Sequence, residues 1–142
     1  MKKSFLLICI ILLLSSCGSK LNPEWYPLGS GKDTVCVLGN GKFNLGKTSS
    51  GIDLSMYDDE GYSGVLLAKV SGYKKKNGKL YVFSEEGYCV AYEDTNTAKV
   101  LIIVEEQYYS NLVGEDEAVE YLASFEDFSN EEQKILKQLE NE

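Results

Sequence analysis

The stretch KLYVFSEEGYCVAY, residues 79–92, decides the fold. Its two halves, 79–84 and 87–92, are rich in the β-branched and aromatic side chains that fit a pleated, half-buried surface. Glu85 and Glu86, followed by a glycine, separate them as a short turn. Just before the stretch, Asn77-Gly78 is a dipeptide that tolerates the positive φ angles of a tight hairpin. The region therefore predicts antiparallel strands joined by tight turns.

Short apolar stretches separated by turn signals extend over most of the middle of the chain. Asn40-Gly41 is a second tight-turn dipeptide, and like the first it is followed by a lysine and an apolar stretch. Residues 100–104 are apolar throughout, which is typical of a central strand buried on both faces. We therefore expect an antiparallel β-meander of about six or seven short strands, at 34–38, 42–46, 51–56, 63–70, 79–84, 87–92 and 98–104.

The C-terminal third has a different periodicity. Apolar residues at 119, 122 and 123, and again at 135, 136 and 139, fall at helical spacing. These positions predict two amphipathic helices. The first would begin near Gly114, and the second at Ser129, where Glu132 completes a capping box. Helices that cover one face of the meander would give an α+β domain.

The N-terminus carries the features of an export signal. Lys2 and Lys3 form a basic segment, and residues 5–14 form an apolar run of about ten residues. A helix needs roughly 20 apolar residues to cross a bilayer, so this run is too short for a permanent span. We interpret residues 1–16 as a signal peptide that is removed on export.

The end of that segment, Leu14-Ser15-Ser16-Cys17, resembles the lipobox of bacterial lipoproteins. The resemblance covers the first seventeen residues only. It implies that Cys17 carries lipid after cleavage before it. The lipid would anchor the protein outside the cytoplasm, in the outer membrane or, in a Gram-positive host, on the outer face of the cell membrane. Gly18 and Ser19 follow, so no aspartate resembling an inner-membrane retention signal is present. The alternative is an ordinary secretory signal with a chance cysteine near its end.

Residues 17–33 are rich in Gly, Ser and Pro and show no periodicity, so we expect them to act as a flexible tether. Residues 34–142 are then a single α+β domain. Loss of Lys2 and Lys3 with the signal changes the formal net charge from -8 to -10. Such an acidic chain is a poor partner for nucleic acid, which needs a basic face. The excess acid lies in residues 105–142, so the acidic C-terminal helices are a candidate contact face for a basic protein.

Two cysteines, Cys36 and Cys89, remain in the exported domain. Outside the cytoplasm two thiols can persist as a disulfide, and a bridge that closes a loop of this length would contribute roughly 3 to 4 kcal/mol. Spacing alone does not show whether the two residues lie close enough to pair. A Cys36–Cys89 disulfide and two separate thiols therefore both remain open.

The chain offers few groups for catalysis. It has no histidine and no arginine, and thus lacks the usual general base, zinc ligand and phosphate clamp. Asp58-Asp59-Glu60 lacks the alternating order of a calcium loop and is interpreted as a solvated turn. We predict no cofactor, no metal site and no enzymatic activity.

Ten tyrosines are the remaining distinctive feature, with Tyr73, Tyr81, Tyr88 and Tyr92 close together and Tyr108-Tyr109 beyond them. Tyrosine is enriched at recognition surfaces, but it also forms ordinary cross-strand pairs. The sequence thus indicates a membrane-anchored surface lipoprotein that acts as a non-catalytic binding module. Two more specific alternatives are an immunity-type or inhibitor lipoprotein for a basic protein, and a glycan- or peptidoglycan-binding module.

Overall fold

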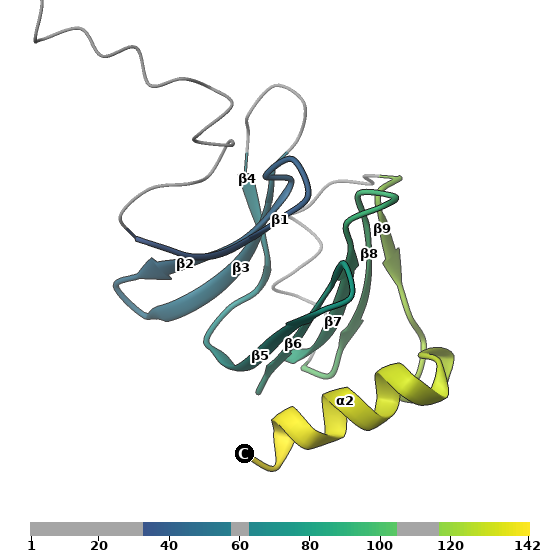
Figure 1. The fold of residues 1–142 in the computed structure, drawn as a ribbon. Coiled ribbons are helices and arrows are strands. Elements are labelled where there is room, and N and C mark those ends of the chain that lie inside the picture. Colours follow the sequence, from purple (N-terminus) through teal and green to yellow (C-terminus); the bar gives the residue numbers. More distant parts are fainter. Residues whose placement is uncertain (1–32, 58–62, 105–116) are drawn as a thin grey trace, which may run out of the picture.

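The computed structural model describes residues 33–57, 63–104 and 117–142. Nine strands, one 3-10 turn and one α-helix lie in these residues (Figure 1). In chain order they are β1 (Thr34–Leu38), β2 (Phe43–Thr48), β3 (Gly51–Tyr57), β4 (Ser63–Leu67), β5 (Val70–Lys76), β6 (Lys79–Ser84), β7 (Gly87–Tyr92), β8 (Thr97–Ile102), β9 (Val119–Tyr121), η2 (Phe125–Asp127) and α2 (Asn130–Glu140).

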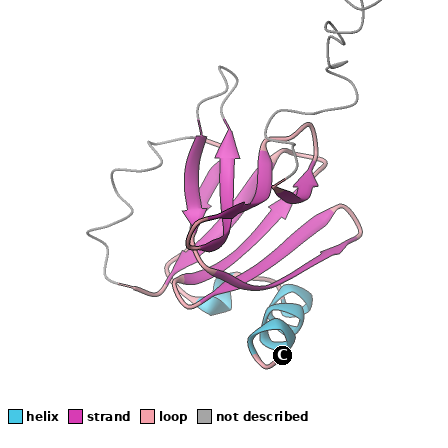
Figure 2. Ribbon diagram, turned by 90° about the vertical axis from the view of Figure 1, so that its left-hand side faces the viewer, coloured by secondary structure: helices cyan, strands magenta, loops and turns pink. Residues whose placement is uncertain are grey.

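The strands form two sheets instead of the single meander expected from the sequence. The N-terminal sheet has the order β1-β2-β3-β4, and the C-terminal sheet has the order β5-β6-β7-β8-β9. All neighbours pair antiparallel except β8 and β9, which are parallel. Figure 2 shows the helical residues on one side of the strands, so the layers follow the order sheet, sheet, helix.

The tight-turn dipeptides form hairpins as predicted. Asn77 and Gly78 have φ angles of 51° and 70° and join β5 to β6, where Lys76 pairs with Lys79. Asn40 and Gly41 lie in the turn between β1 and β2, where Leu38 pairs with Phe43. Gly87 begins β7 at a point where a Cβ atom would overlap the Leu101 carbonyl oxygen, so only glycine fits there.

The strand predicted at 63–70 is in fact two elements from different sheets. The chain leaves the N-terminal sheet after Leu67 and enters the C-terminal sheet at Val70. Lys69 has a φ of 51°, which a continuous strand does not allow. The Asp53 carboxylate accepts the Lys69 N–H at 2.9 Å, and the Glu86 carboxylate accepts the Ala68 N–H at 2.9 Å. A side chain of β3 and one of the β6–β7 turn therefore fix the crossover.

The prediction of two C-terminal helices is not confirmed. The start of the first one, near Gly114, lies outside the described residues, and its described part, Val119–Tyr121, is the strand β9. Hydrogen bonds to β8 from the residues just before and just after β9 decide this conformation. The Ala98 N–H donates to the Ala118 carbonyl, and the Leu122 N–H donates to the Val100 carbonyl, both at 2.8 Å. The second helix is α2, and it begins after Ser129 as predicted.

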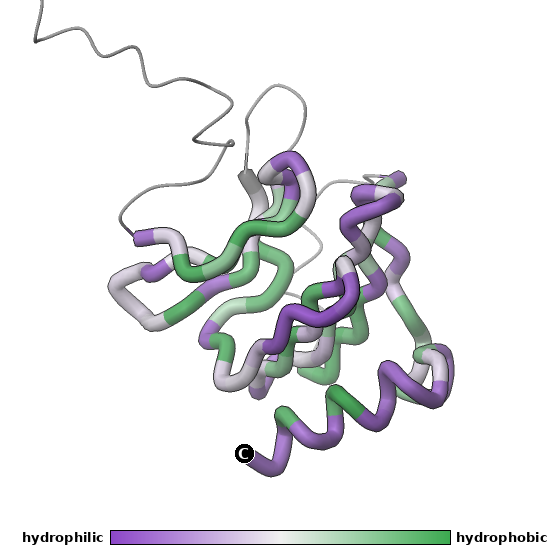
Figure 3. Tube along the Cα trace, in the orientation of Figure 1, coloured by the Kyte–Doolittle hydropathy of each residue, from purple (hydrophilic) through white to green (hydrophobic). Residues whose placement is uncertain are grey.

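Two hydrophobic clusters hold the layers together. Alternate residues of β6 to β8 point to opposite faces of the C-terminal sheet. One set, including Leu80, Val82 and Val100, packs against the N-terminal sheet, where Phe43 is fully buried. The other set packs against α2 and its preceding turn. Figure 3 shows this distribution, with apolar segments concentrated in the strands and α2 mostly hydrophilic.

Candidate functional site

Cys17, the predicted lipid site, and the whole of residues 1–32 lie outside the described residues. The same holds for Asp58-Asp59-Glu60 and for Tyr108-Tyr109. Among residues 33–57, 63–104 and 117–142, no helix is long and apolar enough to cross a membrane.

Cys36 and Cys89 are free thiols, so the disulfide alternative does not describe this structure. Both contribute to the cluster between the sheets, but Cys36 is half-buried on β1 and Cys89 is completely buried on β7. Burial raises the pKa of both thiols, although the Lys75 ammonium opposes the rise at Cys36. The two cysteines belong to different sheets, and the Cys36 thiol is directed to the neighbouring Val37 carbonyl, 3.9 Å away.

The clustered tyrosines lie mainly between the C-terminal sheet and α2. Tyr81 and Tyr88 are buried, whereas Tyr73 on β5 is 43% exposed. The Tyr88 ring stands 5.3 Å from the Phe83 ring and 4.9 Å from that of Phe125. Tyr81 and Tyr88 therefore act as core residues, and they do not form the open aromatic platform that a glycan would need.

Glu132 is the most buried charged residue of this region. Its carboxylate accepts a hydrogen bond from Lys79 Nζ at 2.8 Å and one from the Tyr92 hydroxyl at 2.9 Å. The Ser129 N–H donates to it at 3.0 Å, while the Ser129 hydroxyl accepts the Glu132 N–H. This is the predicted capping box, extended to two side chains of the sheet. We call these four residues the helix clamp.

The clamp shifts the pKa values of its members. Burial raises the pKa of Glu132, but the hydrogen bonds from Lys79, Ser129 and Tyr92 outweigh it and hold that pKa below its ordinary value. The hydrogen bond to Glu132 raises the pKa of Lys79. Burial, reinforced by the bond to Glu132, raises the pKa of Tyr92 strongly. The carboxylate stays ionised and the phenol stays protonated at neutral pH, so the clamp is suited to docking the helix and offers no group for proton transfer.

The charges of α2 are distributed unevenly around the helix. Glu131 and Glu132, in its first turn, bond to Lys76 and Lys79 of the β5–β6 hairpin at 3.4 and 2.8 Å. The exposed positions further along include Lys134 and Lys137. Much of the acid of α2 is thus neutralised within the molecule. Residues 117–127 carry four further exposed acids, Glu117, Glu120, Glu126 and Asp127, of which Glu120 lies 3.9 Å from the Lys99 ammonium.

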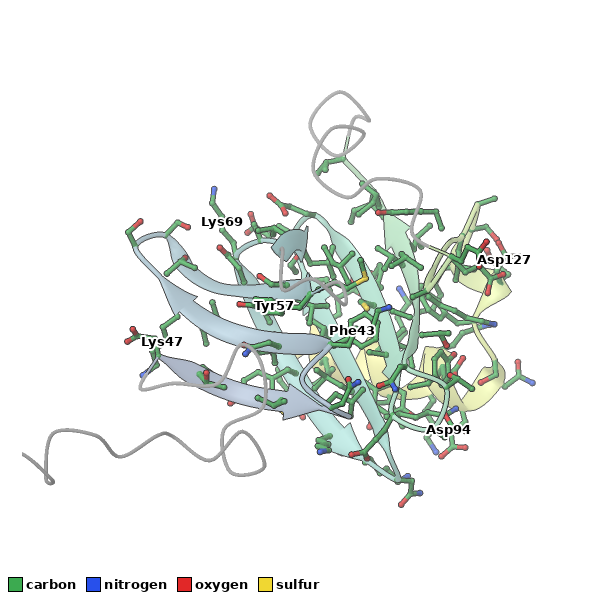
Figure 4. All side chains as sticks on the ribbon, turned by 90° about the horizontal axis from the view of Figure 1, so that it is seen from above. Phe43, Lys47, Tyr57, Lys69, Asp94 and Asp127 are labelled. Carbon is green, nitrogen blue, oxygen red and sulfur yellow. The ribbon has the colours of Figure 1, made fainter. Side chains whose placement is uncertain are left out.

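Figure 4 places Lys47 and Lys69 near the N-terminal sheet and Asp127 at the opposite end, beside the C-terminal elements. Within the described part of the chain, no group of three or more His, Cys, Asp or Glu residues could hold a metal ion.

Sequence reasoning found half of the helix clamp. Ser129 and Glu132 form a local motif of four residues, which a sequence displays directly. Lys79 and Tyr92 lie 53 and 40 residues away from Glu132, and no pattern in the sequence links them to it.

The comparisons with known proteins give no family. No protein-family model matches the chain, and neither a curated protein nor a solved structure is similar to it at a significant level.

Proposed function

We propose that this protein is an exported bacterial lipoprotein, anchored by lipid at Cys17, whose domain acts by binding without catalysis. One observation carries the proposal: a basic segment, an apolar run of about ten residues and Leu14-Ser15-Ser16-Cys17 follow one another in the order and spacing of a lipoprotein signal. Two acyl chains on one cysteine suffice for stable membrane attachment. The absence of histidine and arginine is the reason for preferring binding over catalysis.

The tether would set the domain at a distance from the membrane. Asp33, the residue before β1, lies sixteen positions after Cys17. A fully extended chain of that length spans at most about 55 Å, and a Gly- and Ser-rich chain is on average much shorter. The domain would therefore stay near the membrane surface.

The experiment that tests the anchor compares the full chain with its Cys17→Ala variant in a bacterial host. We expect the wild type to gain the mass of a diacylglyceryl modification and to stay in the membrane fraction after a high-salt wash. The variant should lack the lipid mass. Cys36→Ala is the matched control, because it also removes one thiol but should leave lipid and fractionation unchanged. Wild-type protein without lipid would make an ordinary secreted protein the better reading.

A basic protein is the partner class that the charges favour. The exported chain has a net charge of -10, and exposed carboxylates at Glu117, Glu120, Glu126 and Asp127 lie in its C-terminal part. Such a surface would steer a cationic protein and repel anionic membrane headgroups. An immunity or inhibitor role toward a basic protein is one form of this function. The glycan alternative has less support, since Tyr81 and Tyr88 are buried beneath α2.

A further inference from the structure

The two edges of the C-terminal sheet differ in their chemistry. At one edge, β5 carries three exposed lysines in succession, Lys74, Lys75 and Lys76. Lysines on an edge strand discourage pairing with another chain. At the other edge, β9 consists of Val119, Glu120 and Tyr121. That edge has no lysine of its own.

One side of the β9 backbone faces away from its neighbouring strand, β8. The hydrogen bonds that flank it use the Ala118 carbonyl and the Leu122 N–H, which face β8. A parallel strand bonds to one neighbour through alternate residues. The N–H and C=O groups of Val119 and Tyr121 therefore point away from β8, and β9 is the last strand of the sheet among the described residues.

The side chains around this edge combine apolar and acidic groups. Tyr121 is 50% exposed, and Ile103 and Val104, which follow β8 at the same end of the parallel pair, are 54% and 39% exposed. Exposed apolar side chains bordered by polar ones are typical of interaction surfaces. Among the charged neighbours, Glu117 and Glu120 are both exposed, and the Lys99 ammonium of β8 lies 3.9 Å from the Glu120 carboxylate, so these three groups together keep a negative charge. This combination is complementary to a partner that carries apolar and cationic side chains in alternation.

We infer that the β9 edge docks an extended, basic segment of a partner protein, which adds to the C-terminal sheet as a further strand. The inference rests on the proposed binding function and names the chemistry of its partner. Hydrogen bonds to the Val119 and Tyr121 backbone supply affinity, as in other cases of strand addition. The carboxylates of Glu117 and Glu120 select cationic over anionic segments.

The test uses the full chain in detergent micelles and a blocked heptapeptide that alternates lysine and valine. A peptide that alternates glutamate and valine is the control. Amide NMR shifts report where each peptide binds. The lysine peptide should produce its largest shifts at Val119 and Tyr121, and these should diminish as salt is added. The glutamate peptide should produce none there. Equal binding of both peptides, no binding of either, or shifts centred on β5 or α2 would overturn the inference.

Two variants separate the backbone from the charge. Val119→Pro removes one outward N–H and leaves the bonds between β9 and β8 in place, so the peptide should bind at least about fivefold more weakly. Glu120→Lys reverses a charge without changing the backbone and should also weaken binding. If either variant keeps the wild-type NMR spectrum outside β9 and still binds the lysine peptide with unchanged affinity, the inference is contradicted. The lipid at Cys17 is measured separately, so a failed anchor and a failed docking edge are distinguishable.

Discussion

The two faces of the C-terminal sheet are built from different side chains. The face toward the N-terminal sheet is aliphatic and small, with Leu80, Val82, Cys89, Ala91 and Val100 all fully buried. The face toward α2 is largely aromatic, with Phe83 and the tyrosines of β6 and β7. An aliphatic face excludes water and carries no polar group to orient its partner. The aromatic face has a polar tip at its margin, the Tyr92 hydroxyl, which bonds to Glu132 and so fixes where the helix lies.

This comparison indicates two units of different stability. The cluster between the sheets contains no residue of α2, and the cluster beneath α2 contains no residue of the N-terminal sheet. Removal of contacts from one cluster should therefore leave the other largely intact. Proteins commonly open in such contiguous units, and a terminal helix is a natural candidate for the less stable one.

The largest expected effects come from truncating one leucine on each face. Leu80 and Leu136 are both fully buried, and Leu→Ala at either should cost about 2 to 5 kcal/mol of unfolding free energy or of local stability. Leu80→Ala should lower the hydrogen-exchange protection of all the strands. Leu136→Ala should expose mainly the amides of α2. If Leu136→Ala deprotects the amides of β2 and β3 equally, the two clusters belong to one cooperative unit.

The parts of the fold that sequence predicted are those set by local chemistry. Strands β1, β6 and β7 have the predicted bounds, and the hairpin at Asn77-Gly78 forms where its dipeptide allows positive φ angles. The crossover at Lys69 depends on carboxylates from Asp53 and Glu86, which lie 16 and 18 residues from the amides they accept. Strand β9 is three residues long, too short to display alternation, and its partner β8 precedes it by many residues. Nonlocal hydrogen bonds of this kind leave no periodic signal.

Removal of the Glu132 charge tests how the aromatic face holds its helix. Glu132→Gln keeps the shape of the side chain but leaves Lys79 without its anion, and we expect a loss of about 2 kcal/mol. Lys79 is partly exposed and can regain water, which limits the loss. Glu131→Gln is the matched control, since its bond to Lys76 is exposed and should contribute less than about 0.5 kcal/mol. Equal losses from the two variants in urea unfolding would contradict a special role for the clamp.

The pH dependence follows from the same carboxylate. Because the pKa of Glu132 is lower in the folded state than its ordinary value near 4.5, the clamp contributes fully above that value and weakens as pH falls through the folded pKa. The wild type should thus lose part of its stability between about pH 5 and pH 3, and Glu132→Gln should lose less over that range. The measurement is the urea midpoint at each pH. Parallel curves for the two proteins would show that other carboxylates govern the acid limb.

The smallest effect expected is at Gly72, where α2 approaches β5 most closely. A Cβ atom there would lie 3.1 Å from the Leu139 carbonyl oxygen and 3.2 Å from its Cβ, so the end of the helix would have to move by a few tenths of an ångström. Gly→Ala in a strand gains about 0.5 to 1 kcal/mol by restricting the unfolded chain, and crowding against the helix offsets that gain. Gly72→Ala should therefore change the unfolding free energy by less than about 1 kcal/mol, while the amides in the last turn of α2 exchange faster.

Gly46→Ala is the control, because its Cβ would meet only ordinary contacts at 3.5 and 4.0 Å. It lies on the N-terminal sheet, away from the helix, and should stabilise the protein slightly. The contrary outcome is that Gly72→Ala stabilises the protein as much as Gly46→Ala does, while the amides of α2 stay protected from hydrogen exchange. The helix would then adjust to the sheet without strain, and its position would be less fixed than the helix clamp implies.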